Sequence, residues 1–391
     1  MPSSTSSSSA GAGSGSGSGA APGSGAGPGS APGGPPHVPL REIPGVPWGR
    51  AALLMLVLFL GAMAGWEAHW RAQGFGPTIR NSEGLWAATR RRVDRAEPRQ
   101  TVLLGSSRML FDIDLDAWEE ETGVLPVQLA LEGTNPRPVL RGLAEDPDFK
   151  GLALVGVTPV LFLAPGAGYR AKAIARYGSE SPSQWLGQRI SMPLERVLAF
   201  YHFDTALFAV LHRQTWWPAR PGLPFQARDV RRLTDMDARR EADLWWKLDE
   251  DPEYAALAQS IWSDIIDHPP PPPPEEEAKE QFETMLEEVR EDVASIRARG
   301  GDVAFVRLPS AGHFREVEAA AFPREGVWEP IVAAAGAVAV HFEDYPELRD
   351  VRVPEWSHVS AKDKGRLTRA LVRILKAKFD ERGEPRPELE R

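Results

Sequence analysis

Hydrophobic residues in this chain form one long uninterrupted run, followed by short runs that alternate with amphipathic segments. The long run, Ala51 to Trp66, carries no charge, and its 16 residues would extend about 24 Å as a helix, slightly less than the roughly 30 Å hydrocarbon core of a bilayer. Arg50 can snorkel outward, and the tryptophans at 48, 66 and 70 lie where interfacial aromatic residues are expected. We therefore expect one transmembrane helix over residues 48–70.

Two other interpretations of this run stay open. Ala62-Met63-Ala64 fits a signal-peptidase site, although the tail before the run is long for a signal peptide, and a run this short could also be a buried core helix. The Lys and Arg residues on the two flanks are too similar in number to orient the segment by the positive-inside rule.

From residue 100 the pattern alternates between strand and helix. Short continuous apolar runs predict buried strands at 101–104, 126–131 and 152–157, with helices at 114–122 and 138–145 between them. Near the end of the chain the same rhythm returns, with strands expected at 302–308 and 338–342 and helices at 328–335 and 361–378. This alternation predicts an α/β fold, a three-layer α/β/α sandwich around a five-stranded parallel sheet.

A long segment, 170–299, interrupts this rhythm and predicts a helical insertion, whose part 170–285 we expect beside or above the carboxyl ends of the strands. Residues 170–270 contain helical stretches and no clear strand, and six prolines from Pro269 predict a polyproline spacer before a long helix, Glu275 to Arg299. Within the insertion, 194–217 is apolar but contains several charged residues, which argues against a second transmembrane helix. Its aromatic surface could still touch the bilayer.

Amino-acid composition sets the boundary of the N-terminal tail and completes the expected division of the chain into segments. Ser, Gly, Ala and Pro dominate the N-terminal tail, which cannot bury a core and is expected to be disordered. The expected order is a disordered tail (1–47), the transmembrane anchor (48–70), a juxtamembrane helix (71–99), the first part of the α/β domain (100–169), the insertion (170–299), the second part of the domain (300–380) and a charged tail (381–391).

Charge and cysteine content exclude several classes of function. A net charge of −9 argues against nucleic-acid binding, which needs a basic face. The absence of cysteine excludes disulfides, thiolate catalysis and cysteine-ligated zinc. The histidines show no metal-ligand spacing, so we expect neither a metal nor a cofactor.

Two distant motifs are candidates for one active site. Ser107 follows the first strand run in Gly105-Ser106-Ser107-Arg108, at the strand end where an α/β sheet presents a nucleophile. His358 precedes the last helix, and Glu355 lies three residues before it, a spacing that suits a base and the acid that orients it. A serine that caps a turn and a histidine that caps a helix are the structural alternatives.

These motifs resemble those of the SGNH/GDSL hydrolase superfamily, whose first block is Gly-Asp-Ser and whose last is Asp-x-x-His. The layout is also similar to the membrane-tethered branch that includes D-alanyl-lipoteichoic-acid transfer and alginate O-acetylation proteins. The resemblance covers about 100–165 and 300–380 and implies the strand order 2-1-3-4-5. It implies Ser107 as nucleophile, His358 as base and Glu355 as acid, with Ser106 at the usual Asp position.

The resemblance also implies where substrate is held. Gly133 matches the glycine that contributes an N–H to the oxyanion hole, and Asn135 could add a side-chain amide. The third block of the family is Gly-x-Asn-Asp, whereas this chain has Thr158 at the asparagine position, followed by a proline without N–H. Arg307, after the fourth strand, could bind an acidic substrate group or turn toward a buried ion pair.

Two functions follow as expectations. The first is a membrane-anchored esterase or O-acyltransferase, with its domain outside the cytoplasm, that acts on an acyl ester of the cell envelope. The second is a non-catalytic envelope protein of the same fold that binds a membrane acyl-carrier or assembly partner. No nucleic-acid partner is expected in either case.

Overall fold

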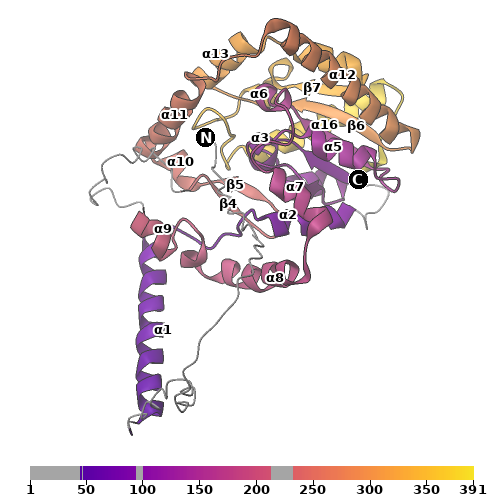
Figure 1. Cartoon of the computed structure of the whole chain (residues 1–391). Coiled ribbons are helices and arrows are strands. Elements are labelled where there is room, and N and C mark those ends of the chain that lie inside the picture. The colour runs from indigo at the N-terminus through magenta and orange to yellow at the C-terminus, as the bar shows by residue number, and fades with distance from the viewer. Residues whose placement is uncertain (1–44, 46, 94–99, 213–231) are drawn as a thin grey trace, which may run out of the picture. The chain divides into compact units, whose positions relative to one another are not determined.

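The computed structural model of the chain describes residues 45, 47–93, 100–212 and 232–391 (Figure 1). The expected disordered tail therefore lies almost entirely outside the described residues. The chain divides into two units, 1–58 and 59–391, with the boundary inside the first helix.

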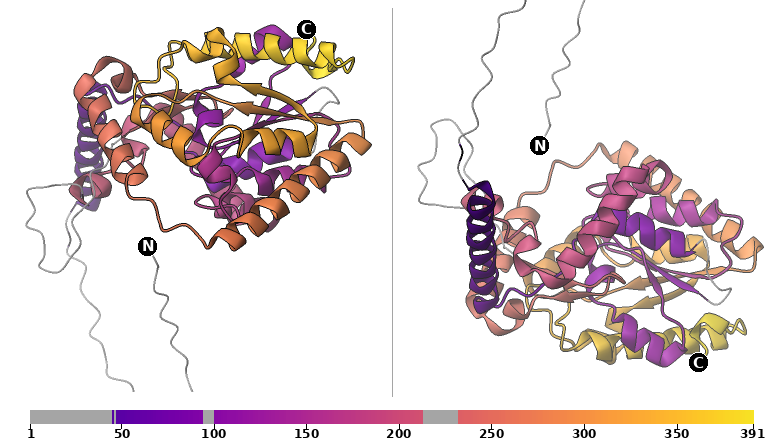
Figure 2. Two further views of the ribbon diagram at one scale, coloured as in Figure 1. Left: turned by 90° about the horizontal axis from the view of Figure 1, so that it is seen from above. Right: turned by 90° about the horizontal axis from the view of Figure 1, so that it is seen from below.

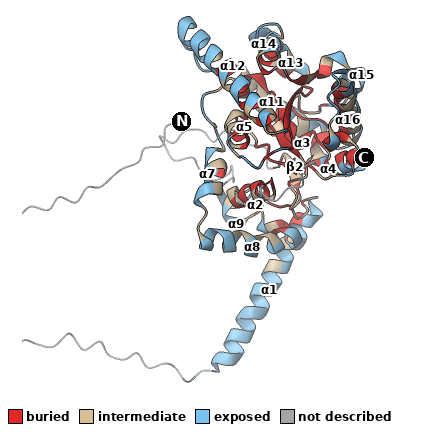
Figure 3. Cartoon of the chain, turned by 90° about the vertical axis from the view of Figure 1, so that its right-hand side faces the viewer, coloured by how far each residue is buried: buried red, intermediate tan, exposed pale blue. Residues whose placement is uncertain are grey.

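Helix α1 (Trp48–Ala72) is long and apolar enough to cross a membrane. Its 25 residues extend about 37 Å, and residues 48–62 are exposed (Figure 3). The helix continues two residues beyond the expected 48–70. Its last turns pack on the insertion, where Trp66 Nε1 donates to the carbonyl of Thr205 (3.3 Å) and Arg71 Nη2 to that of Val197 (2.8 Å).

A five-stranded parallel sheet lies at the centre of the second unit, in the order β2-β1-β3-β6-β7. The strands are β1 (Thr101–Leu104), β2 (Val127–Gln128), β3 (Leu152–Gly156), β6 (Asp302–Arg307) and β7 (Val338–His341). All neighbouring pairs run parallel. Counted along the sequence this is 2-1-3-4-5, so the expected α/β class, sheet and strand order are confirmed. Strand β2 is shorter than the expected 126–131.

Both faces of the sheet are buried, because alternate strand residues point to opposite sides. Leu103, Leu154 and Val306 belong to one apolar cluster, whereas Val102, Val155 and Phe305 belong to the other. The first cluster includes side chains of α3 (Ser107–Phe111), α4 (Leu115–Thr122) and α16 (Lys364–Glu381). The second includes those of α5 (Arg137–Ala144), α12 (Glu275–Ala298) and α14 (Trp328–Ala335). Figure 2 shows the sheet between α16 and α12.

Local sequence signals place several of these helices as expected. Asp114 caps α4 by accepting the N–H of Ala117 (2.8 Å), and Gly123 ends it in the left-handed conformation. Helix α2 (Glu83–Val93) lies within the expected juxtamembrane segment, and α12 begins at the predicted Glu275. Helix α13 (Gly312–Ala321) was not predicted, because its polar face and missing side-chain cap resemble a loop.

The insertion contains two strands, so the expectation of no strand in 170–270 is wrong. Strands β4 (Thr234–Met236) and β5 (Ala242–Leu244) form an antiparallel hairpin. Each is too short to show alternation, and the turn lacks the usual glycine: Arg240 itself has φ +66°. Its guanidinium is held by the carbonyls of Gln128 (2.6 Å) and Ala130 (2.7 Å), which fixes this turn against β2.

The remaining elements are helices, and most of them belong to the insertion. They are α6 (Pro159–Phe162), α7 (Ala171–Ser179), α8 (Pro182–Val197), η1 (Ala199–Tyr201), α9 (Leu207–His212), α10 (Trp246–Glu250), α11 (Pro252–Ile266), η2 (Phe342–Asp344), α15 (Pro346–Arg349) and η3 (Pro387–Leu389). The segment 194–212 is divided among α8, η1 and α9, which agrees with the argument against a second transmembrane helix; residues 213–217 lie outside the described ranges.

Candidate active site

The turn after β1 is tightly packed and leads directly into a helix. A Cβ at Gly105 would lie 2.4 Å from the Cβ of Met109, so this position needs glycine. Ser106 is buried and shares a 2.7 Å hydrogen bond with the Thr158 hydroxyl. Ser107 is the half-buried first residue of α3, whereas the sequence predicted that the helix begins several residues later.

His358 and Glu355 form a buried pair in the loop before α16. His358 Nδ1 lies 2.8 Å from Glu355 Oε1, and the same oxygen accepts the His358 backbone N–H at 2.6 Å. Glu355 is 0% and His358 is 1% exposed. Because the carboxylate accepts at Nδ1, the ring keeps a proton there and leaves Nε2 as the basic nitrogen. Nε2 has no hydrogen-bond partner among the described residues.

The insertion completes this pair with a tryptophan that the sequence did not point to. Trp262 of α11 donates its indole N–H to Glu355 Oε2, so both carboxylate oxygens are satisfied. The rings of Trp262 and Phe111 lie 6.2 and 4.6 Å from the His358 ring, between centroids. Part of the insertion thus reaches the region of the candidate site.

Helix α3 contacts the histidine loop at three points. Arg108 Nε donates to the Ser357 carbonyl (3.2 Å), Phe111 packs on His358, and Asp112 Oδ1 accepts the Val359 N–H (2.9 Å). Ser107 is four residues before Phe111, so the two lie on one face of α3, one turn and about 6 Å apart. The two motifs, 250 residues apart in sequence, are therefore neighbours. No hydrogen bond joins Ser107 Oγ to His358 Nε2 in this structure.

Asp112 is a further functional candidate that its sequence context did not reveal. The residue is fully buried, and burial raises the pKa of its carboxyl to about 7, although the charge of His358 and the Val359 N–H act in the opposite direction. Its Oδ2 has no hydrogen-bond partner among the described residues. A group this close to the histidine loop changes charge near neutral pH.

The candidate oxyanion donors differ in whether they already have a hydrogen-bond partner within the protein. Gly133 follows β2 with φ +60°, two residues after Leu131, whose N–H donates to the Gly105 carbonyl (3.0 Å). Asn135 Nδ2 donates to the Ala164 carbonyl (2.7 Å), and its Oδ1 accepts a backbone N–H. The Thr158 hydroxyl is engaged with Ser106. Leu131 thus lies beside the turn after β1, and Gly133 follows it by two residues, whereas the side chains of Asn135 and Thr158 already have hydrogen-bond partners.

Arg307 lies in a buried ion-pair cluster, which is the second of the two roles considered for it. Glu318 Oε2 accepts from Arg307 (2.8 Å) and Ser310 (2.9 Å), and lies 3.0 Å from Arg108 Nη2. Burial raises the pKa of Glu318, but the two guanidinium groups outweigh it and hold this pKa below its ordinary value. The cluster fixes α13 against β6 and α3. Glu318 was missed because the helix that carries it, α13, was not predicted from the sequence.

Among the described residues, no group of three or more His, Asp or Glu side chains could hold a metal ion. No protein-family model, curated protein or solved structure matches the chain.

Proposed function

We propose that this chain is a membrane-anchored esterase or O-acyltransferase with a Ser107-His358-Glu355 triad. The observation that carries the proposal is the buried His358–Glu355 pair, whose free Nε2 lies in the loop that packs on α3. The chemistry fits an SGNH-like three-layer sandwich, in which strand ends carry the reacting groups.

The chemical step is acyl transfer through the serine. Ser107 Oγ attacks the carbonyl carbon of an ester while His358 Nε2 takes the hydroxyl proton. The tetrahedral oxyanion is stabilised by the N–H groups of Ser107 and Gly133, and the leaving alcohol recovers the proton from His358 as its C–O bond breaks. Water or an acceptor hydroxyl then resolves the acyl-enzyme, with His358 again as base. Glu355 stabilises the imidazolium throughout.

The placement of the domain follows from the anchor. If α1 crosses the bilayer, the tail and the α/β domain lie on opposite sides, and the resemblance to envelope acylation proteins favours an extracytoplasmic domain. The substrate is then an acyl ester of the cell envelope. A phosphatase reporter fused after Arg391 should be active, and a reporter that works only in the cytoplasm should be silent there.

The second candidate is a non-catalytic protein of the same fold that binds an acyl-carrier or assembly partner. One specific observation favours it: the side chains of Thr158 and Asn135, which could have donated to an oxyanion, are bonded within the protein. Loss of one such donor costs roughly 100- to 1000-fold in turnover.

A fluorophosphonate probe separates the two. The full chain in detergent should be labelled, and Ser107→Ala and His358→Ala should lose the label. Equal labelling of all three proteins would refute the triad. An unlabelled wild type that retains a partner through the insertion would support the non-catalytic role.

A further inference from the structure

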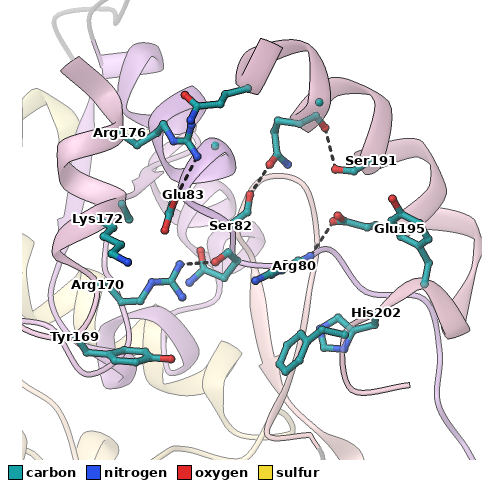
Figure 4. A pocket seen from close by; sticks show the side chains of 18 residues that line it. Arg80, Ser82, Glu83, Tyr169, Arg170, Lys172, Arg176, Ser191, Glu195 and His202 are labelled. Atoms are coloured by element: carbon teal, nitrogen blue, oxygen red, sulfur yellow. Dashed lines mark hydrogen bonds and ion pairs between the residues drawn. The ribbon is translucent and has the colours of Figure 1, made fainter. Parts of the chain in front are cut away.

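A large cavity with several charged residues in its wall lies between the start of α2, helices α7 and α8, and the segment after η1, and the serine is not among its lining residues (Figure 4). Its volume is about 730 Å³. Four cationic side chains line it, together with two carboxylates: Arg80, Arg170, Lys172, Arg176, Glu83 and Glu195.

The cations are only partly neutralised. Arg176 pairs with Glu83 (3.1 Å), and Arg170 pairs with Glu132 (2.5 Å) at the edge of the cavity. Glu195 accepts the backbone N–H of Arg80 (2.9 Å), not its guanidinium. Within the described ranges, neither Arg80 nor Lys172 has a carboxylate within 4.0 Å. Arg80 instead lies over the Phe203 ring, 5.7 Å from its centroid.

A fifth cation lies behind the cavity wall. Arg240 is fully buried, and its donors go to uncharged acceptors, including Oδ1 of Asn81, a residue that lines the cavity (3.1 Å). Burial lowers the pKa of Arg240 to about 9; Glu132 opposes this, and the charge of Arg170 lowers it further. The positive charge around the cavity therefore exceeds what its carboxylates balance, and a bound anion would relieve the excess.

We propose that this cavity binds a phosphate group. Phosphate offers several acceptor oxygens and up to two negative charges, which suits the three guanidinium groups and one ammonium group that line the cavity from the segment before α2 and from α7 with its N-cap residue. Arg80 and Lys172 are its primary ligands, because their charges are not already paired. Arg170 and Arg176 keep their structural ion pairs and add donors from the wall.

The position of the cavity favours a lipid as the source of the phosphate. Two residues near it, Tyr201 and Phe203, continue the exposed apolar side chains of α8 and α9, including Leu194 and Leu207. The last turns of α1 pack on the segment between η1 and α9, where the Trp66 indole N–H donates to the Thr205 carbonyl. The lipid source therefore rests on the proposed membrane anchor, whereas the phosphate site itself does not, and neither depends on the serine chemistry.

The test is isothermal titration of the full chain in phosphatidylcholine nanodiscs. The two titrants are inorganic phosphate and dihexanoyl phosphatidic acid, a short-chain soluble lipid. We expect binding that weakens at least about tenfold in Arg80→Gln and again in Arg80→Gln/Lys172→Gln, the loss expected for charge-assisted hydrogen bonds. Tighter binding of the lipid than of inorganic phosphate would identify a lipid source, and equal binding would exclude that source while keeping the phosphate site.

Arg189→Gln is the matched control. Arg189 lies on α8, next to the cavity-lining Gln188, but its guanidinium lies over the exposed Trp185 ring, 4.0 Å from the centroid, and the residue does not line the cavity. This variant should bind like wild type, and all variants should keep the wild-type melting temperature. Absence of binding by the wild type, or equal losses in Arg189→Gln and Arg80→Gln, would overturn the proposal.

Discussion

Replacing Asp112 by asparagine should change how the stability of the protein depends on pH. The folded protein holds the Asp112 proton up to about pH 7, whereas an unfolded chain releases it near pH 3.8. Between these values the folded state binds more protons than the unfolded state, so this group's contribution to stability falls as pH rises. Below about pH 4 both states are protonated and the contribution is fully present.

The magnitude follows from the same two values. The difference between about 7 and 3.8 corresponds to about 4 kcal/mol, since one pKa unit is worth about 1.4 kcal/mol. Asparagine carries no charge at either pH, and its Oδ1 can still accept the Val359 N–H. Its buried amide adds a cost of about 1–3 kcal/mol that does not depend on pH. Relative to wild type, Asp112→Asn should therefore gain about 4 kcal/mol between pH 4 and pH 8.

Urea unfolding of the full chain in detergent at pH 4, 6 and 8 measures this difference. The other buried acids contribute equally to the pH dependence of both proteins, so their contributions cancel in the difference between the two unfolding free energies. Asp116→Asn is the control, because hydrogen bonds from Arg239 hold the pKa of Asp116 below its ordinary value of 3.8, so this carboxyl is ionised in both the folded and the unfolded state over most of the assay range. The stability difference between that variant and wild type should therefore stay nearly constant from pH 4 to pH 8. If the difference between Asp112→Asn and wild type were constant over this range, the burial argument would be wrong.

Three further substitutions test the packing of the site. Trp262→Phe should cost about 1–3 kcal/mol and reduce probe labelling, because a buried oxygen of Glu355 loses its donor; unfolding and labelling of the same sample measure both. Gly105→Ala should destabilise the fold by about 1–3 kcal/mol, since the new methyl group meets Met109, and the melting temperature should fall. Glu318→Gln should cost about 3–5 kcal/mol in urea unfolding, because two buried guanidinium groups lose their carboxylate.

Each of these has a control in the same chain. Trp246→Phe removes the indole donor of a 42% exposed side chain, whose partner is the Gly74 carbonyl, and should cost less than Trp262→Phe because water can replace the lost donor. Gly142→Ala adds a methyl group on α5 that meets nothing within 4 Å, and should stabilise the helix by about 0.5–1 kcal/mol. Glu291→Gln removes an exposed carboxylate 3.6 Å from Arg141 and should change stability by less than about 1 kcal/mol. Equal effects within a pair would contradict the role assigned to burial.

The sheet could be predicted from sequence because each strand is a continuous apolar run buried on both faces. A continuous apolar run such as 152–157 has no polar side for solvent, so it predicts a strand in a sheet that is covered on both faces. The hairpin 234–244 escaped prediction because its strands have three residues each and its turn depends on Arg240, held by carbonyls of a distant strand. Tertiary contacts of this kind leave no local signal.

The candidate site shows the same division. Glu355 and His358 are close in sequence, so their pairing could be anticipated from spacing alone. Trp262 and Asp112 reach the same loop from distant elements, and nothing in their own neighbourhoods marks them. Arg307 had two possible orientations, and the choice between them depends on Glu318, which lies on a helix that the sequence did not predict.

Mapping the residue that reacts with a fluorophosphonate tests the central proposal most directly. The full chain is labelled in detergent at pH 8, digested, and the modified peptide is sequenced by mass spectrometry. We expect the phosphonate on Ser107 and not on Ser106, whose hydroxyl is buried against Thr158, with the label absent in His358→Ala. A label on another serine, or a Ser107 that stays unmodified in folded protein, would contradict the proposed triad.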